Sequence, residues 1–584
     1  MSAIHAAEHS DRIMRLPRDR RRWLFPLLLL VLCATLFFWR LGITPLDDFD
    51  EAYYAEGARE MLERGDLGTP YYNGQPFLLK PILIYWLIAA AFRIFGHTEF
   101  AARSVSAFFA AVIVLATYWF AARTINPRTG FLAGVALALS YQWIDTGREA
   151  MIDMPLTAAL APAMFLFFTA LHLQPDRKRL LYLAAYPLLG IALLAKGPAP
   201  TAVVLAGLFG YLLSARRLRV FLGEAHILPG IALLLAVAAP WYIYESLHQP
   251  GFVQTFLIRE HFGHLQGELA RDEPWYGHLK NLLIGFYPWV AFLPAALAHA
   301  FRRTDRQHVL RFTSWWALAV IAAFSFAGAK LPHYLVPAFP PMAILVAGWF
   351  DAWFEERAKG SAWTGLGFGL LVTIGLALAA ATAIAVVMPP FVRERLSAQF
   401  GSWTPGAAPV VMLAVLAAGS LLAPIAAAFG RRRAVAPVLA AAMLAAAAAH
   451  IGWFKPHLAQ IQAQPRKELA RFAGEILPQS EPLGVYKAKR NATIFYARRP
   501  IVDLGEWDDQ ELVSFLSSPD PRTALTHEEL VPILREEVPG VHVWMRRGSY
   551  LLVTNHSPHH IWAPAGRADL KSSAEQHSTR AVAP

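Results

Sequence analysis

The chain has 584 residues, of which 56% are hydrophobic and 16% are charged, with a mean hydropathy of +0.37. Soluble domains carry about 25% charged residues, so the composition excludes an ordinary soluble enzyme and indicates an integral membrane protein. The formal net charge of +11 is concentrated in short Lys and Arg clusters between apolar segments, such as residues 18–22, 216–219 and 431–433. Clusters in such places orient a membrane chain, and no nucleic-acid partner is expected from them.

The N-terminal segment predicts an uncleaved first membrane span. Residues 1–22 are basic and residues 23–39 are apolar, without a small-residue cleavage site, which favours a span over a signal peptide. The single cysteine, Cys33, lies in this apolar segment. No internal disulfide can therefore form, and cysteine usage does not reveal the compartment.

About 13 apolar segments reach the length of a membrane span, which is about 20 residues. They lie at residues 23–41, 101–121, 129–145, 152–172, 179–195, 198–214, 226–245, 281–300, 312–328, 333–351, 363–388, 406–429 and 434–453. A further segment, 81–95, is marginal in length. If it does not cross, the N-terminus and all the main basic loops fall on the cytoplasmic side, as the positive-inside bias requires. We therefore predict about 13 transmembrane helices, with the chain beyond residue 453 outside.

This topology collects the polar residues of separate loops on one outer face. They are Asp47, Asp48, Asp50, Glu51 and Lys80 of the first loop, with Arg148, Glu149, Asp153, Lys196, Glu260, His261, His264, Lys330, His333 and Tyr334. Charged groups at membrane level are costly unless they serve a function. Their convergence predicts an active site at the outer face.

The first outer loop holds the densest polar group. Residues 51–64 predict an amphipathic helix lying on the membrane, because Tyr54, Ala58, Met61 and Leu62 share one face at helical spacing. Asp48 or Asp50 can cap its start and Gly65 can end it. One aspartate suffices for a cap, so the three aspartates indicate a further role.

Several other polar residues have a structural alternative. Lys80 can contact a substrate or can be an anchor that extends to the interface, and Asp153 can act chemically or simply favour a helix start. Lys196 has the same two interpretations as Asp153. In the second outer loop, 246–280, the Glu260–His261 pair with His264 and His278 could hold a metal or an anion, although this loose spacing is a weak metal motif.

Beyond residue 455 the composition changes to that of a small α/β domain. We expect helices at 467–475, 508–516 and 528–536, and strands at 483–486, 493–496, 523–526, 541–544 and 551–553. The predicted organisation is a cytoplasmic tail (1–22), a transmembrane domain (23–454) with catalytic loops at 43–100 and 246–280, the α/β domain (455–556) and a disordered tail (557–584). The α/β domain has no visible catalytic motif, so a supporting role is expected.

A series of motifs in sequence order resembles a known family. They read FDEAYYAEGAREML, NGQPFLLKPILIYW, GHTEFAARSVSA, IDMPL, LLAKGP, PWYIYESLHQPGF with IREHFGHL, and AGAKLPHYLVPAFPP. Together they resemble the lipid-A aminoarabinose transferases and their protein-mannosyltransferase relatives, which are membrane glycosyltransferases of the GT-C fold. The resemblance covers most of residues 20–350 and the layout of the C-terminal domain. It implies a polyprenyl-phosphate sugar donor, a lipid-A, lipopolysaccharide-type or other cell-envelope acceptor, and a bacterial inner membrane with the α/β domain in the periplasm.

The resemblance also implies roles for residues that match the motifs. Asp50, with Glu51 beside it, and Asp153 correspond to active-site carboxylates. Lys80, Lys196, His261 and Lys330 are expected to bind the donor phosphate, and Tyr53, Tyr54, Glu260, His264, His333 and Tyr334 are expected to bind substrate. No cofactor is required, a divalent metal is an open alternative, and the expected form is a monomer.

Three positions differ from the aminoarabinose enzymes. Tyr53 and His264 stand where those enzymes have Arg, and Leu79 stands where they have Glu before the lysine. These differences remove a candidate metal ligand and weaken an anion site. They therefore count against aminoarabinose as the sugar and a lipid-A phosphate as the acceptor, but not against assignment to the superfamily. Two other function classes are weighed against glycosyl transfer: a lipid or ion transporter, which would place charges at mid-span, and a non-catalytic member of the fold.

Overall fold

The computed structural model describes residues 23–47, 50–172, 177–256, 274, 276–302, 308–328, 330–355, 362–387 and 407–556. The chain divides into two compact units, Met1–Ala463 and Gln464–Pro584. The predictions for Asp48, Glu260, His261 and His264, and for the tails 1–22 and 557–584, lie outside the described residues.

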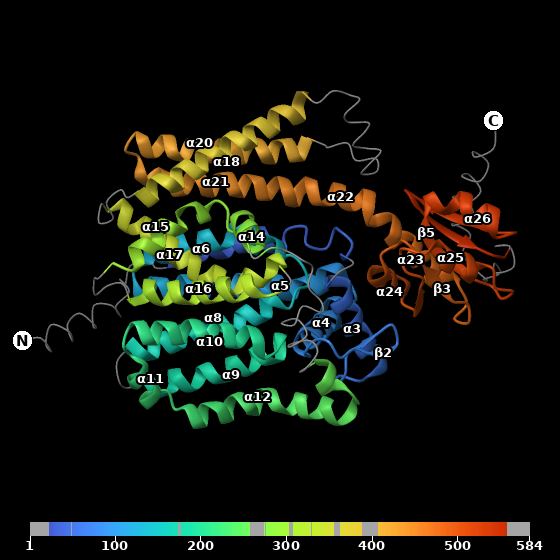
Figure 1. The fold of residues 1–584 in the computed structure, drawn as a ribbon, viewed down its shortest axis with the longest axis horizontal. Coiled ribbons are helices and arrows are strands. Elements are labelled where there is room, and N and C mark those ends of the chain that lie inside the picture. The colour runs from blue at the N-terminus through green and yellow to red at the C-terminus, as the bar shows by residue number, and fades with distance from the viewer. Residues whose placement is uncertain are drawn as a thin grey trace, which may run out of the picture. The chain divides into compact units, whose positions relative to one another are not determined.

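The first unit is almost entirely helical (Figure 1). Its elements are α2 (Leu24–Cys33), η2 (Ala34–Phe38), α3 (Asp50–Arg64), β1 (Tyr71–Tyr72), β2 (Gln75–Pro76), α4 (Leu83–Phe95), α5 (Glu99–Thr124), α6 (Pro127–Ala138), α7 (Tyr141–Gly147), α8 (Asp153–His172), α9 (Lys178–Lys196), α10 (Pro198–Ser214), α11 (Leu218–Glu224), α12 (Ile227–His248), α14 (Gly277–Gly285), η5 (Trp289–Phe292), α15 (Leu293–Ala300), α16 (His308–Phe326), η7 (Pro332–Ala338), α17 (Phe339–Phe354), α18 (Ala362–Val387), α20 (Ala407–Ala428), η8 (Arg432–Ala434), α21 (Val435–Ala449), η9 (His450–Phe454) and α22 (Lys455–Gln462).

Nine helical segments among the described residues are long and apolar enough to cross a membrane, or up to 11 if each of two bent pairs is one span. The bent pairs are α10 with α11, at 120°, and α14 with η5 and α15, at 110°. The segment 129–145, predicted as one span, is instead divided between α6 and α7. α4 has 13 residues, about 20 Å at about 1.5 Å per residue, which is shorter than the membrane core of about 30 Å. The topology based on positive charges stays a prediction.

Close helix packing builds the core of this unit. α8 packs against α9 and α5, α10 packs against α16, and α20 packs against both α18 and α21. Small residues permit such approach: a Cβ atom on Gly207 of α10 would lie 2.6 Å from Trp316 Cα of α16. A side chain at this position would push the two helices apart.

The structure confirms the predicted helix of the first loop but not its placement on a surface. α3 runs from Asp50 to Arg64, and the shared apolar face of Tyr54, Ala58 and Met61 is buried. Its polar face is also largely buried, because Glu56 pairs with Arg59 at 2.5 Å and the β1–β2 hairpin covers Glu60 through the Gly74 amide. The hairpin closes over the face that was expected to meet water.

The second unit contains a five-stranded sheet in the order β4-β3-β5-β7-β6. Its elements are α23 (Gln464–Ile476), β3 (Leu483–Val485), α24 (Arg490–Ala497), β4 (Ile501–Asp503), α25 (Asp509–Leu516), β5 (Thr523–His527), η10 (Glu528–Leu530), α26 (Val531–Glu537), β6 (His542–Arg547) and β7 (Tyr550–Thr554). β3 is parallel to β4 and β5, whereas β7 is antiparallel to β5 and β6. The small α/β fold is thus confirmed.

One predicted strand of this unit is wrong. Residues 493–496 lie in α24, and the strand that pairs with β3 is β4, a few residues later. The β-branched and aromatic side chains of 493–496 suit a strand, but they are buried in the contact between α24 and α23. In addition, residue 455 was the predicted start of the α/β domain, whereas the first unit extends to Ala463, because α22 follows η9 directly at Lys455.

Candidate active site

Asp50 and Tyr54 lie one helical turn apart at the start of α3. The Tyr54 hydroxyl donates to Asp50 Oδ1 at 3.4 Å, and Tyr54 is 1% exposed. Burial and then the negative charge of Asp50 raise the pKa of Tyr54 well above its usual range, with smaller contributions from Tyr85, Asp153 and Tyr334. Tyr54 therefore stays a neutral donor directed at the Asp50 carboxylate.

Asp153 forms a second buried carboxylate site with Lys196. Asp153 begins α8 and Lys196 ends α9, so the antiparallel packing of these helices brings the Lys196 Nζ to 2.8 Å from Asp153 Oδ1. Asp153 Oδ2 is buried and accepts no hydrogen bond from the described residues. The Lys196 ammonium also lies 4.7 Å from the ring centroid of Tyr334, a cation–π contact. One carboxylate oxygen thus remains as an acceptor at this point.

His333 lies within electrostatic range of both carboxylate sites. It lies in η7 beside Tyr334, and its ring is within electrostatic reach of Asp153, Lys196, Asp50 and Lys80. Lys80 is half-buried in the segment before α4. The structure therefore brings together Asp50, Tyr54, Lys80, Asp153, Lys196, His333 and Tyr334, which come from the start of α3, the segment before α4, the facing ends of α8 and α9, and η7.

Two other predicted residues occupy separate surroundings. Tyr53 stacks on Tyr72 with ring centroids 4.2 Å apart and meets the edge of Phe77 at 4.4 Å. Lys330 is 7% exposed, and its ammonium group donates to the carbonyl oxygen of Ala327. Tyr53 thus belongs to an aromatic cluster next to Asp50, and Lys330 fixes the chain just after α16.

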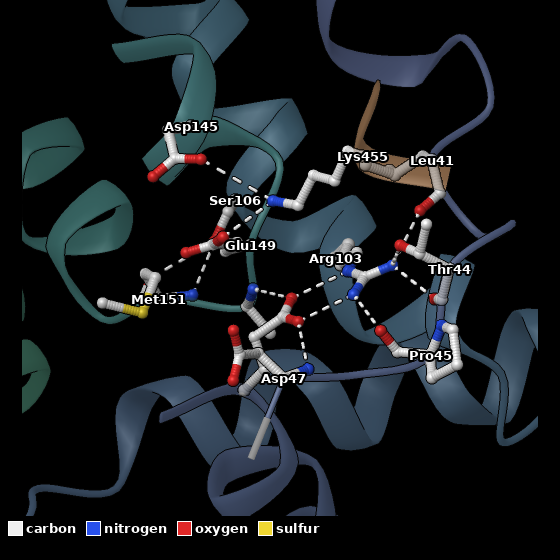
Figure 2. Close-up of polar contacts among 12 residues, drawn as sticks. Leu41, Thr44, Pro45, Asp47, Arg103, Ser106, Asp145, Glu149, Met151 and Lys455 are labelled. Atoms are coloured by element: carbon white, nitrogen blue, oxygen red, sulfur yellow. Dashed lines mark hydrogen bonds and ion pairs between the residues drawn. The ribbon is translucent and has the colours of Figure 1, made fainter. Parts of the chain in front are cut away.

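Glu51 accepts four hydrogen bonds in a buried network, and Figure 2 shows the part of this network around Arg103 and Asp47. Its Oε1 accepts from Arg103 Nε at 2.7 Å and from the Ala150 amide at 2.9 Å, and its Oε2 accepts from Arg103 Nη2 at 2.7 Å and from the Asp47 amide at 2.8 Å. Burial by itself raises the pKa of Glu51, but the charge and hydrogen bonds of Arg103 outweigh it and hold the pKa below its usual range. Glu51 is therefore an ionised, fully bonded carboxylate.

Arg103 joins this carboxylate to the chain that leads into α3. It donates to the carbonyl oxygens of Leu41 at 3.1 Å, Thr44 at 2.8 Å and Pro45 at 2.8 Å. The sequence interpretation missed Arg103 as a site residue, although it lies within the GHTEFAARSVSA motif. An arginine inside an apolar helix was the available signal.

Lys455 is the second residue that the sequence interpretation missed. Its Nζ lies 2.8 Å from Glu149 Oε1 and 3.6 Å from Asp145 Oδ1, and Figure 2 shows it between these two carboxylates. It stands at the end of the last apolar segment, where a lysine is also an ordinary interface anchor. Its pairing with Glu149, 306 positions away, has no signal in the sequence.

A metal site was the open alternative at Glu260 and His261, and these residues lie outside the described part of the chain. Among the residues that the structure describes, no group of three His, Cys, Asp or Glu side chains could hold a metal ion. The site consists of carboxylates, ammonium groups, two phenols and an imidazole.

Comparison with known proteins places this site in a known fold. Residues 79–244 match the family described as dolichyl-phosphate-mannose-protein mannosyltransferase. The crystal structure of ArnT from Cupriavidus metallidurans bound to undecaprenyl phosphate superposes with a TM-score of 0.74, at 21% identity, over 94% of this chain and 100% of that chain. The chain therefore has the ArnT fold, and its residues 79–244 are similar to the mannosyltransferase family named above.

Relatives in sequence agree with this ArnT-like assignment. The undecaprenyl phosphate-alpha-4-amino-4-deoxy-L-arabinose arabinosyl transferase of Erwinia tasmaniensis is 30% identical over 375 residues, which are 63% of this chain and 66% of that protein. An uncharacterised protein of Aquifex aeolicus is 29% identical over 358 residues, 60% of this chain and 69% of that one. The alignments thus span about two thirds of these relatives. The C-terminal α/β unit and the multi-pass helical unit together make this an ArnT-like membrane protein.

Proposed function

We propose that this protein transfers a sugar from a polyprenyl phosphate to a lipid-linked or glycan acceptor of the cell envelope. The observation that carries the proposal is the meeting of Asp50, Asp153 and Lys196 around Tyr54 and His333 in a chain with the ArnT fold. In GT-C enzymes the donor supplies its own leaving group, so the protein needs mainly charge and geometry. The site therefore contains both a carboxylate that can accept a proton and lysine side chains that can bind a phosphate.

The site must first stabilise the leaving phosphate. As the bond between the sugar C1 and the phosphate oxygen breaks, negative charge grows on the phosphate and a nearby cation stabilises it. We assign the main phosphate contact to the half-buried Lys80 at the start of the segment before α4, and a supporting contact to Lys196, which also pairs with Asp153. His261 is a further candidate. Lys330, which binds the Ala327 carbonyl, is assigned to the edge of this site.

The site must also activate the acceptor hydroxyl. A bond forms between its hydroxyl oxygen and C1, its proton passes to Asp50, and the polyprenyl phosphate departs. Tyr54 orients Asp50 through its hydroxyl. Asp153 Oδ2, with its open acceptor position, is proposed to hold a hydroxyl or amine of the sugar or to steady positive charge at C1.

The remaining predicted residues are assigned by their surroundings. Glu51 has all its hydrogen bonds within the protein, so we propose that it positions Asp50 and does not touch the reacting atoms. Tyr53, His333 and Tyr334 are proposed to line the sugar and lipid path, and Glu260 and His264 to contact the acceptor.

The sugar, acceptor and orientation are the finer parts of the proposal. The named relatives transfer 4-amino-4-deoxy-L-arabinose, and Tyr53, Leu79 and His264 depart from that subfamily, so a pentose or hexose other than aminoarabinose fits as well. Lipid A or another lipopolysaccharide-type glycan is the proposed acceptor. The basic loops favour a bacterial inner membrane with the site and the α/β unit on the periplasmic side, and the working form is proposed to be a monomer.

Mass spectrometry of the lipid-A, glycan and polyprenyl-phosphate fractions tests this function. Cells lacking the protein and cells carrying Asp50→Asn should both lose one sugar from one acceptor and accumulate its polyprenyl-phosphate donor. The matched control is Glu63→Gln, the same carboxylate-to-amide change at the exposed end of α3, which should retain the modification.

Two outcomes would contradict the proposal. If Asp50→Asn retains a modification that the null strain loses, Asp50 is not catalytic. If no fraction changes in the null strain, a transporter or a non-catalytic role becomes the better interpretation.

A further inference from the structure

The two carboxylates of the proposed site stand on segments far apart in the chain. Asp50 begins α3 and Asp153 begins α8. Glu51, the neighbour of Asp50, accepts the amide of Ala150 at 2.9 Å, and Ala150 precedes Asp153 by three positions. Ser106 holds the same segment through the Met151 amide at 3.0 Å. Glu51 therefore connects the start of α3, which contains Asp50, directly to the segment that leads into Asp153.

Lys455 holds the other side of the Ala150 segment. Its Nζ is 2.8 Å from Glu149, the residue before Ala150. Ala150 thus stands between two carboxylates, Glu51 and Glu149, whose charges repel each other. Two cations oppose this repulsion: Arg103 on Glu51 and Lys455 on Glu149 (Figure 2).

This cluster contains three acidic and three basic side chains. The carboxylates are Glu51, Asp145 and Glu149, and the cations are Arg103, Arg148 and Lys455. Arg148 also binds the carbonyl oxygens of Leu36 at 2.7 Å and Trp39 at 3.0 Å. Burial and then the charge of Asp145 raise the pKa of Glu149 to about 8 even though Lys455 opposes the shift. Without Lys455, Glu149 would lose the ion pair that ties it to α22 and would take up a proton more readily, so the Ala150 segment would lose this anchor.

We propose that Lys455 is a positioning residue for the glycosyl transfer: through Glu149 it holds residues 149–153 against Glu51 and so sets the separation of Asp50 and Asp153. The expected effect on catalysis rests on the proposed function, whereas the expected effect on the position of residues 149–153 does not. A displacement of about 1 Å between reacting groups can cost about a hundredfold in rate. Lys455 therefore affects transfer without touching the substrate.

Hydrogen exchange of the full-length protein in lipid nanodiscs tests the structural step. In Lys455→Met, the amides of Asp47 and Ala150, which both bind Glu51, should exchange at least about tenfold faster, with the rest of the first unit unchanged. Lys455→Arg should restore slow exchange because it keeps the cation. The matched control is Lys178→Met, which removes a lysine from a comparable half-buried pair with Glu224, 2.5 Å long, and should leave both amides as in the wild type.

Transfer and ligand binding test the catalytic step. In Lys455→Met, the modified fraction of the acceptor should fall by about tenfold to a hundredfold, while binding of undecaprenyl phosphate, measured by native mass spectrometry, should stay within about twofold. Lys455→Arg should recover the modification. A loss of binding in parallel with transfer would instead make Lys455 part of the phosphate site.

The outcomes separate this inference from the proposed function. If Asp50→Asn retains the modification, the proposed function fails whatever Lys455 does. If Asp50→Asn abolishes it but Lys455→Met retains both slow exchange and transfer, the positioning role is wrong. Faster exchange throughout the first unit of Lys455→Met would also overturn it, because Lys455 would then support the fold in general.

Discussion

Arginine–carboxylate ion pairs occur in both units of this protein, but their surroundings differ. In the membrane unit, Glu51 and Arg103 are 2% and 3% exposed and share two 2.7 Å hydrogen bonds. In the α/β unit, the side chains of Arg490 and Asp503 are 53% and 40% exposed. Water screens the second pair and competes for its atoms, so its contribution is about 0–1 kcal/mol. Water does not compete for the buried pair, and removal of one partner would leave the other as an unpaired buried charge.

The comparison indicates what each kind of pair does. The buried pair ties α3 to α5 and to the amide of Ala150, so it fixes the geometry of several segments. The exposed pair joins the start of α24 to the edge strand β4 of one small sheet. Charge is therefore retained inside the membrane unit at a large desolvation cost, which is reasonable where position matters for chemistry.

Arg103→Met should have the largest effect on stability. It leaves the Glu51 carboxylate buried without its cation and removes the bonds to Leu41, Thr44 and Pro45, so the expected loss is about 3–5 kcal/mol. Thermal unfolding in one detergent measures it, with Arg490→Met as the matched control in the exposed pair. Equal losses in the two variants would contradict the contrast between the units.

Asp153→Asn should have the next largest effect, mainly on activity. The amide cannot neutralise Lys196, which remains 16% exposed beside Tyr334, and it removes the open carboxylate oxygen. We expect the modified fraction of the acceptor to fall by about a hundredfold or more and Tm to fall by a few degrees. Asp509→Asn, in the exposed pair with Lys487 at 2.9 Å, should change neither the activity nor the Tm of the membrane unit.

Glu149→Gln should change the pH dependence of stability. The folded-state pKa of Glu149 is raised from 4.5 to about 8, so the folded state binds more protons than the unfolded state in this interval and stability falls as pH rises through it. The neutral amide should remove this part of the fall between pH 5 and pH 8. Tm measured across that range checks it, and an unchanged slope would show that Glu149 titrates normally.

Lys487→Met should have the smallest effect. Lys487 is 28% exposed and pairs with Asp509, whose hydrogen bonds from Tyr486 and Lys487 hold its pKa below the usual range. The carboxylate stays hydrated after the substitution, so we expect a loss of at most about 1 kcal/mol in the unfolding of the α/β unit. A loss comparable to that of Arg103→Met would mean that exposure does not separate the two kinds of pair.

The sequence by itself determined the elements whose pattern is local. Apolar runs of membrane length predicted the helices, and the periodic spacing of Tyr54, Ala58 and Met61 predicted α3 to within one residue at its start. Parity of the spans also predicted that Asp50, Asp153 and Lys196 share a face, and of these Asp153 and Lys196 form an ion pair at 2.8 Å. These inferences depend on periodicity and chain order, which a single sequence contains.

Tertiary structure alone decided which charges meet. Nothing local distinguishes Lys455 from an interface anchor, and its partner Glu149 lies 306 positions away. Residues 493–496 have the composition of a strand, but the packing of α24 on α23 made them helical, and the β1–β2 hairpin buried the polar face of α3. Burial and long-range pairing are properties of the folded chain, because the energy of a charge depends on what surrounds it in space.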